Sequence, residues 1–139
     1  DYGVASDVYS VTSFNELARD GQDCERFNML NPDAKAKTPY IATVMNSAPA
    51  IAATDYMKNY ADQVRAFVPA TSYKVLGTDG YGRSDSRENL RRHFEVNAGY
   101  IVVAALSELV KQGELKKAVV VDAIKKFGID AGKTNPLYA

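Results

Sequence analysis

Short apolar segments alternate with longer amphipathic segments along the chain, which is the pattern of an α/β fold with a mostly parallel sheet. β-branched and aromatic residues are enriched over Asp7–Thr12, and further short apolar segments cover Ala50–Ala53 and Lys74–Gly77. We predict a strand in each of these segments.

Helical spacing predicts a helix directly after the first of these strands. Ser13 and Glu16 stand three residues apart at its head, which is the spacing of a capping box. Gly21 is predicted to end this helix, and a further helical turn is predicted over Cys24–Leu30. The apolar segment Tyr40–Met45 fits either a helix or a strand.

Capping residues also predict where the next helices begin. Thr54 or Asp55 is suited to cap a helix after the second strand, and Asp85 with Glu88 forms a capping-box-like start after the third.

The two strongest helical patterns cover Asn97–Gln112 and Leu115–Phe127. Gly113 and Gly128 follow them at positions where helices often end on a left-handed residue.

Length and composition indicate one folded domain, residues 1–139, rather than a fibrous or disordered chain. The sequence is 46% hydrophobic, with 17 basic and 17 acidic residues, so no excess of positive charge points to nucleic acid. The apolar stretch Tyr100–Leu106 is far shorter than the roughly 20 residues of a membrane-spanning helix, so we expect no membrane insertion. A single cysteine, Cys24, fits a reducing compartment, and we expect a cytoplasmic protein. The chain opens on Asp1 rather than Met and shows no signal-peptide pattern, so we expect either a processed or trimmed chain or a piece of a longer protein.

The stretch "GTDGYGRSDSRENLRRHF" is the most distinctive part of the sequence. Its glycines lack both the dinucleotide-binding spacing and the G-K-[ST] of a phosphate loop, and its acidic and basic residues balance. We therefore predict a structural turn and helix cap rather than a ligand site, although anion binding stays open as an alternative. The residues assigned to this turn are Gly77, Asp79, Gly80, Gly82, Arg83, Ser84, Asp85, Arg87 and Glu88.

No catalytic or metal-binding set is apparent in the sequence. His93, the only histidine, has no nearby carboxylate or cysteine arranged with it as a catalytic group. Cys24 lies between two acidic residues, which disfavours a reactive thiolate.

Three stretches carry a resemblance to a known family: "DVYSVTSFNELARDGQDCERFNML", "ATDYMKNYADQVRAFVP" and "VPATSYKVLGTDGYGRSDSRENLRRHFEVNAGYIVVAAL". The chain resembles the C-terminal domain of the homodimeric bacterial pyruvate dehydrogenase decarboxylating components, which are thiamine diphosphate-dependent enzymes. More distantly, the pattern of Gly77, Asp79, Tyr81, Gly82 and Ser84 is similar to a loop in the last domain of transketolases. The resemblance implies a three-layer α/β/α domain that lacks its first strands in this chain.

The resemblance also implies where the chemistry resides. Thiamine diphosphate and magnesium would be bound by preceding domains, so we expect no catalytic, cofactor-binding or metal-binding residue in this chain. The implied partners are those preceding domains, the second subunit of a homodimer and the lipoyl acyltransferase of the complex. The whole enzyme would decarboxylate pyruvate and reductively acetylate lipoyl groups.

Two alternatives to a pyruvate dehydrogenase domain remain open. The chain could be the same domain of an oxoglutarate dehydrogenase component, or a stand-alone anion-binding regulatory domain that uses the glycine and arginine turn. A small independent enzyme is disfavoured, because no nucleophile, base and orienting group fall in one neighbourhood.

Overall fold

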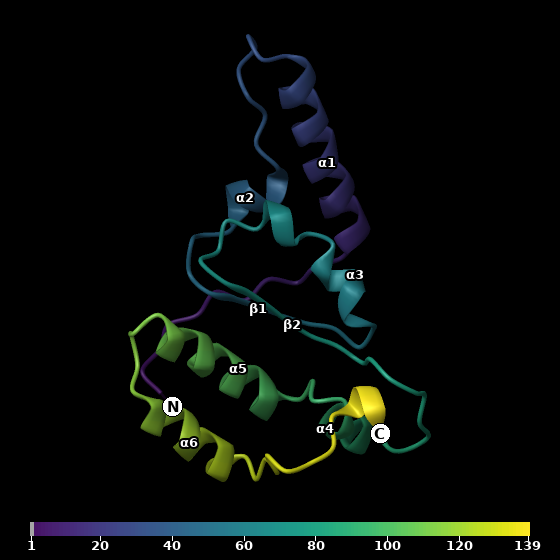
Figure 1. Ribbon diagram of the computed structural model, residues 1–139, viewed down its shortest axis with the longest axis vertical. Helices are drawn as coiled ribbons and strands as arrows, with labels where there is room; N and C mark the ends of the chain where they lie inside the picture. The colour runs from purple at the N-terminus through teal and green to yellow at the C-terminus, as the bar shows by residue number, and fades with distance from the viewer. Residues whose placement is uncertain (1) are drawn as a thin grey trace.

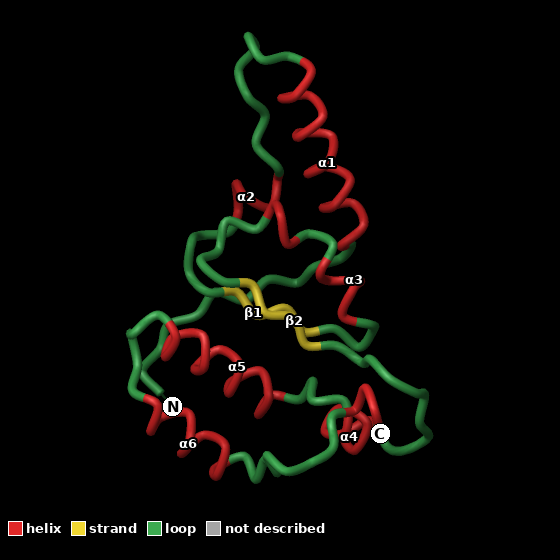
Figure 2. Tube along the Cα trace, viewed as in Figure 1, coloured by secondary structure: helices red, strands yellow, loops and turns green. Residues whose placement is uncertain are grey.

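A pair of parallel strands lies between two groups of helices in the computed structural model, which describes residues 2–139 (Figure 1). The strands are β1 (Ala50–Ala53) and β2 (Tyr73–Leu76), with Ala50 opposite Tyr73 and Ala53 opposite Leu76. The helices are α1 (Phe14–Leu30), α2 (Tyr40–Val44), α3 (Lys58–Asp62), α4 (Arg87–His93), α5 (Ala98–Lys111) and α6 (Lys117–Lys126), with short 3-10 turns at Arg65–Phe67 and Pro136–Tyr138. Figure 2 shows α1, α2 and α3 on one side of the strands and α5 and α6 on the other, so the expected α/β layering is confirmed.

The first predicted strand, Asp7–Thr12, is wrong. These residues are exposed and belong to no strand, because no backbone within residues 2–139 pairs with them. Side chains hold the segment instead: the Tyr9 hydroxyl donates to the Val44 carbonyl at 3.2 Å, and the Asn46 amide donates to Asp7 at 3.0 Å. The second strand lies where it was predicted, and the third begins and ends one residue earlier than expected.

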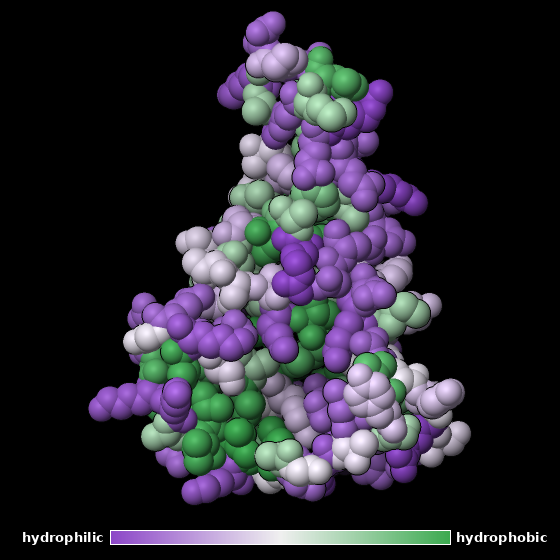
Figure 3. Space-filling model, viewed as in Figure 1, coloured by the Kyte–Doolittle hydropathy of each residue, from purple (hydrophilic) through white to green (hydrophobic). Residues whose placement is uncertain are grey.

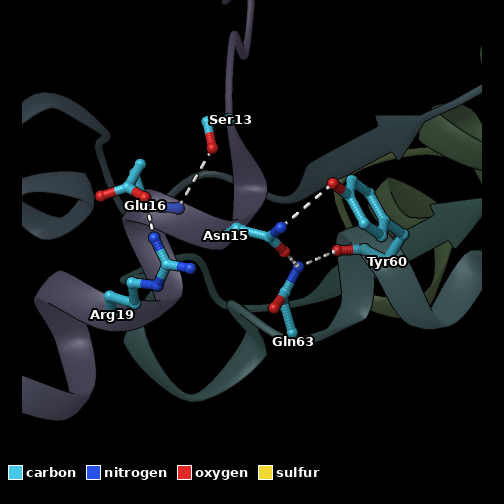
Figure 4. A network of polar contacts seen from close by, with 6 residues as sticks. All are labelled: Ser13, Asn15, Glu16, Arg19, Tyr60 and Gln63. Atoms are coloured by element: carbon cyan, nitrogen blue, oxygen red, sulfur yellow. Dashed lines mark hydrogen bonds and ion pairs between the residues drawn. The ribbon is translucent and has the colours of Figure 1, made fainter.

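The predicted cap of α1 is confirmed, but the predicted break is wrong. The Ser13 hydroxyl accepts the Glu16 N–H at 3.2 Å, as Figure 4 shows. The Glu16 carboxylate, however, pairs with Arg19 rather than closing a capping box. The helix continues through Gly21, and close packing rather than a helix end explains the glycine: a Cβ there would lie 2.3 Å from the Phe67 ring.

The apolar core lies between α1, α2 and the segment that runs from α3 to β2. Ala18, Ile41, Val64 and Phe67 form its buried centre, and Val64 is fully buried. The ambiguous segment at Tyr40 forms α2 rather than a strand, and it contributes Ile41 to this core. A polar network beside it joins α1 to α3 (Figure 4): Asn15 donates to the Tyr60 hydroxyl at 3.2 Å and accepts from Gln63 at 2.9 Å.

Three helices end in the same way, on a residue with left-handed backbone. Gly113 (φ 81°) and Gly128 (φ 59°) follow α5 and α6 as predicted. Glu95 (φ 64°) follows α4, where a glycine would be the ordinary choice. In each case the next N–H reaches back to a carbonyl in the last turn; the Val96 N–H, for example, donates to the Arg91 carbonyl at 2.9 Å. These caps fix how the chain leaves each helix.

Candidate functional site

The predicted turn connects β2 to α4, and Asp79 joins it to the start of α3. One oxygen of the Asp79 carboxylate accepts the backbone N–H of Lys58 at 3.0 Å, and the other lies 3.8 Å from the Lys58 ammonium. The carboxylate therefore caps α3 from a distant part of the chain. The predicted caps of this helix, Thr54 and Asp55, are wrong: Thr54 accepts the Tyr56 N–H at 3.1 Å, and Asp55 pairs with Arg91 at 2.9 Å.

Thr78 adds two further bonds to the same loop. Its backbone N–H donates to the Tyr56 carbonyl at 2.9 Å, and its hydroxyl donates to the Asp55 carbonyl at 3.1 Å. The turn after β2 is thus bonded along its first residues to the segment between β1 and α3.

Close packing explains two of the three glycines in the turn. A Cβ at Gly77 would lie 2.7 Å from the Tyr56 carbonyl oxygen. Gly80 has a φ of 104°, and a Cβ there would lie 2.3 Å from the Pro136 carbonyl oxygen. Gly82 has open space around it. The glycines were predicted to belong to a turn, but their partners, Tyr56 and Pro136, were not predicted, because nothing in the local sequence indicates such distant contacts.

The second half of the turn is exposed and its side chains do not converge. Arg83 lies 3.4 Å from a ring nitrogen of His93, and Tyr81 is 83% exposed. Partial burial lowers the pKa of His93, and the positive charges of Arg83 and Lys133 lower it further. Ser84, Arg87 and Glu88 make no ion pair or side-chain hydrogen bond with other residues in the stretch 2–139.

The helix cap at this turn differs from the prediction by one residue. Ser86 is the N-cap of α4, and its hydroxyl accepts the Asn89 N–H at 3.3 Å. Asp85 precedes the cap and accepts the Asn89 side-chain amide at 2.8 Å and the Ser86 N–H at 2.7 Å. The bond from Asn89 and, to a smaller extent, the bond from Ser86 lower the pKa of Asp85. The expected Asp85–Glu88 capping box is wrong because the serine, with extended backbone, occupies the capping position.

The remaining chemistry-bearing residues are dispersed. Cys24 is buried within α1, away from the turn. Across residues 2–139, no three His, Cys, Asp or Glu side chains gather in a way that suits a metal ion. None of the helices in that range combines the length and apolar character needed to span a bilayer.

Comparison with known proteins places the chain in a family. The family model described as "Transketolase-like TK C-terminal domain" matches residues 1–97. The Pyruvate dehydrogenase E1 component of Escherichia coli (strain K12) is 71% identical over 139 residues, which is 100% of this chain and 16% of the relative. The proteins of the same name in Haemophilus influenzae and Pseudomonas aeruginosa are 60% and 52% identical over 100% and 99% of the chain, and again over 16% of their own length. The chain thus spans about a sixth of the length of these curated relatives and belongs to the transketolase-like C-terminal domain family.

Proposed function

We propose that this chain is the C-terminal structural and assembly domain of a pyruvate dehydrogenase E1 component. The observation that carries the proposal is the 71% identity to the Escherichia coli relative over the whole chain. In this role the chain contributes no catalytic group, and its distinctive turn holds β2, α3 and α4 together. The nine turn residues from Gly77 to Glu88 are then structural.

The whole enzyme would supply the chemistry from its other domains. Those domains would bind thiamine diphosphate and magnesium, decarboxylate pyruvate and reductively acetylate lipoyl groups of an acyltransferase partner. This domain would pack against them and against a second subunit, in the cytoplasm.

The surface of α5 and α6 supports a role in assembly. Residues 101–105 of α5 are all apolar yet only half-buried, and Val121 of α6 is 47% exposed. Figure 3 shows apolar side chains gathered on the part of the surface where α5 and α6 lie. An apolar surface of this kind is stabilised when a further protein surface covers it.

The open sheet supports a domain that continues outside this chain. Within residues 2–139 the sheet holds only β1 and β2, so β1 has one edge without a neighbouring strand. Exposed strand edges carry unpaired N–H and C=O groups that favour pairing with another strand. We propose that a strand from the preceding part of the same polypeptide pairs with this edge.

A chimeric enzyme tests the proposed function. This chain replaces the matching segment of the Escherichia coli E1 component, and pyruvate-dependent activity and subunit assembly are measured. The proposal expects a dimer that is active on pyruvate. A correctly folded chimera that fails to assemble, or that assembles but has no activity on pyruvate, would overturn it.

The open strand edge is tested on the chain by itself. Sedimentation and mass spectrometry are expected to find either association between copies or a retained companion peptide. A cooperative monomer of 15.2 kDa without any companion would contradict the proposed missing strand.

A further inference from the structure

A hollow of about 190 Å³ lies where the end of α4, the start of α5 and the segment after α6 meet. This volume accommodates several water molecules, or a small molecule of similar size. Its polar lining residues are Arg92, Asn97, Tyr100, Asp130 and Lys133, and Phe127 also lines it. The hollow is separate from the exposed half of the glycine and arginine turn.

Arg92 brings a nearly unengaged guanidinium group to this hollow. Its one hydrogen bond to residues of the stretch 2–139 is to the Gly128 carbonyl at 3.5 Å, which is longer than an ordinary N–H···O bond. Within residues 2–139 Arg92 makes no ion pair, although its neighbour Arg91 pairs with Asp55. Because a guanidinium carries five donors in a planar fork, Arg92 is suited to bind a carboxylate or phosphate group.

Lys133 adds a second cation with donor capacity to spare. Its ammonium donates to the His93 carbonyl at 2.8 Å and pairs with Glu95 at 3.0 Å. An ammonium has three donors, so one remains. The two contacts hold the Lys133 side chain at the edge of the hollow.

Tyr100 supplies a neutral donor. Its hydroxyl has no hydrogen-bond partner among residues 2–139. Burial raises the pKa of Tyr100, with a smaller contribution from Glu95, so the phenol keeps its proton at neutral pH. A protonated phenol beside a guanidinium can donate to the same anion.

The acidic lining residue, Asp130, is bonded within its own turn. Its carboxylate accepts the Gly132 N–H at 2.8 Å. Of the charges around the hollow, Lys133 is paired with Glu95, and Asp130 already has a donor. The Arg92 guanidinium is thus the charge that lacks an ion pair among residues 2–139, and it favours an anionic ligand over a cationic one.

The backbone also fixes this arrangement. Glu95 holds a left-handed conformation, with a φ of 64°, at the end of α4, and its side chain pairs with Lys133. Non-glycine residues adopt this conformation at a cost. The Glu95–Lys133 pair therefore ties the segment after α6 to the end of α4, whose last turn carries Arg92.

From these contacts we propose that the hollow binds a small oxyanion, a carboxylate or a phosphate, with Arg92 as its main ligand and Tyr100 and Lys133 as further donors. The proposal rests on the contacts of these residues and does not depend on the function proposed above.

Amide chemical shifts of the isotope-labelled chain test the site. Inorganic phosphate and acetate are titrated separately, at constant ionic strength with chloride as the balancing ion. The expected result is saturable shifts confined to residues 92–100 and 127–133. The phosphate and acetate arms show which of the two oxyanions binds more tightly.

Variants separate a specific site from general charge attraction. Arg92→Gln should weaken binding at least tenfold, and Tyr100→Phe should weaken it by a smaller factor while the spectrum stays that of the folded chain. Arg26→Gln, which removes an exposed arginine on α1, should leave binding unchanged. Failure of both anions to saturate, or equal weakening by Arg92→Gln and Arg26→Gln, would overturn the proposal.

Discussion

The carboxylate of Asp79 lies 3.0 Å from the backbone nitrogen of Lys58 and caps a helix that begins 21 residues earlier in the chain. Helix α3 has no side-chain cap of its own, since its N-cap residue is Met57. The turn after β2 and the start of α3 therefore stabilise each other, and a substitution that disrupts one of them should also destabilise the other.

Replacing Asp79 should show how much this distant cap contributes. Asp79→Ala is expected to lower the free energy of unfolding by about 1 kcal/mol, the usual effect of a lost N-cap. Asp79→Asn keeps an oxygen acceptor and should lose less. Urea denaturation of both variants measures the difference. Equal losses would indicate that the ion pair between the Asp79 carboxylate and the Lys58 ammonium, rather than the hydrogen bond to the Lys58 N–H, stabilises the start of α3.

The two glycines Gly80 and Gly82 form a matched pair for a test of the turn. Gly80→Ala forces a side chain into the Pro136 carbonyl and strains a positive φ, so it should cost more than about 1 kcal/mol. Gly82→Ala meets open space and should change stability by less than about 0.5 kcal/mol. Similar thermal shifts for both variants would contradict the close contact between the turn and the C-terminal segment.

The cap of α4 can be assigned by two alanine variants. Ser86→Ala removes the acceptor of the Asn89 N–H and should lower stability by about 1 kcal/mol. Asp85→Ala removes only exposed bonds beside the cap and should have the smaller effect. Thermal unfolding measures both losses. A larger loss of stability for Asp85→Ala than for Ser86→Ala would show that Asp85, and not Ser86, is the main cap of α4.

Gly21 should resist a change that ordinarily favours helices. Alanine in a helix interior is better than glycine by up to about 1 kcal/mol, but here its methyl group would overlap the Phe67 ring. Gly21→Ala is therefore expected to destabilise the chain by roughly 1–3 kcal/mol, as overpacked cores do. The double variant with Phe67→Leu should recover part of the loss, and additive losses would show that the two positions do not touch.

Acid should weaken the chain partly through Glu108. This carboxylate is 7% exposed, and its hydrogen bond to the Lys111 ammonium lowers its pKa, while burial opposes the shift. A depressed folded pKa gives stability that is present above the ordinary value of 4.5 and is lost as the pH falls through the folded value. Glu108→Gln should flatten the fall in stability below that pH, and Lys111→Met should flatten it too. Unfolding midpoints measured at several acidic pH values check this; unchanged slopes would contradict it.

Local signals in the sequence predicted the elements whose determinants are local. Ser13, Gly113 and Gly128 act at helix ends through bonds to residues a few positions away, so their spacing was informative. Gly21 and Asp79 act through Phe67 and Lys58, which are far along the chain, and no periodicity indicates such partners. The segment at Asp7 has the residues of a strand but no neighbour to pair with, and strand formation depends on that neighbour more than on propensity.

The turn could be predicted from the sequence, whereas the hollow could not. The position of the turn between a strand and a helix was predictable from the glycine and arginine pattern. The hollow at Arg92 was not, because its lining comes from α4, α5 and the segment after α6. Glu95 gave no signal either, since a left-handed glutamate cannot be told from an ordinary helical one by its letter alone.

The contact between Gly80 and the carbonyl of Pro136 has a consequence for synthesis. A ribosome releases the glycine turn long before it has made the proline that packs on it. During translation the turn therefore lacks its packing contact with Pro136, while β1, β2 and α3 can already pack together. Pro136 can complete this region only after it too has been made and released, so a nascent chain stalled before Pro136 should expose the turn to protease.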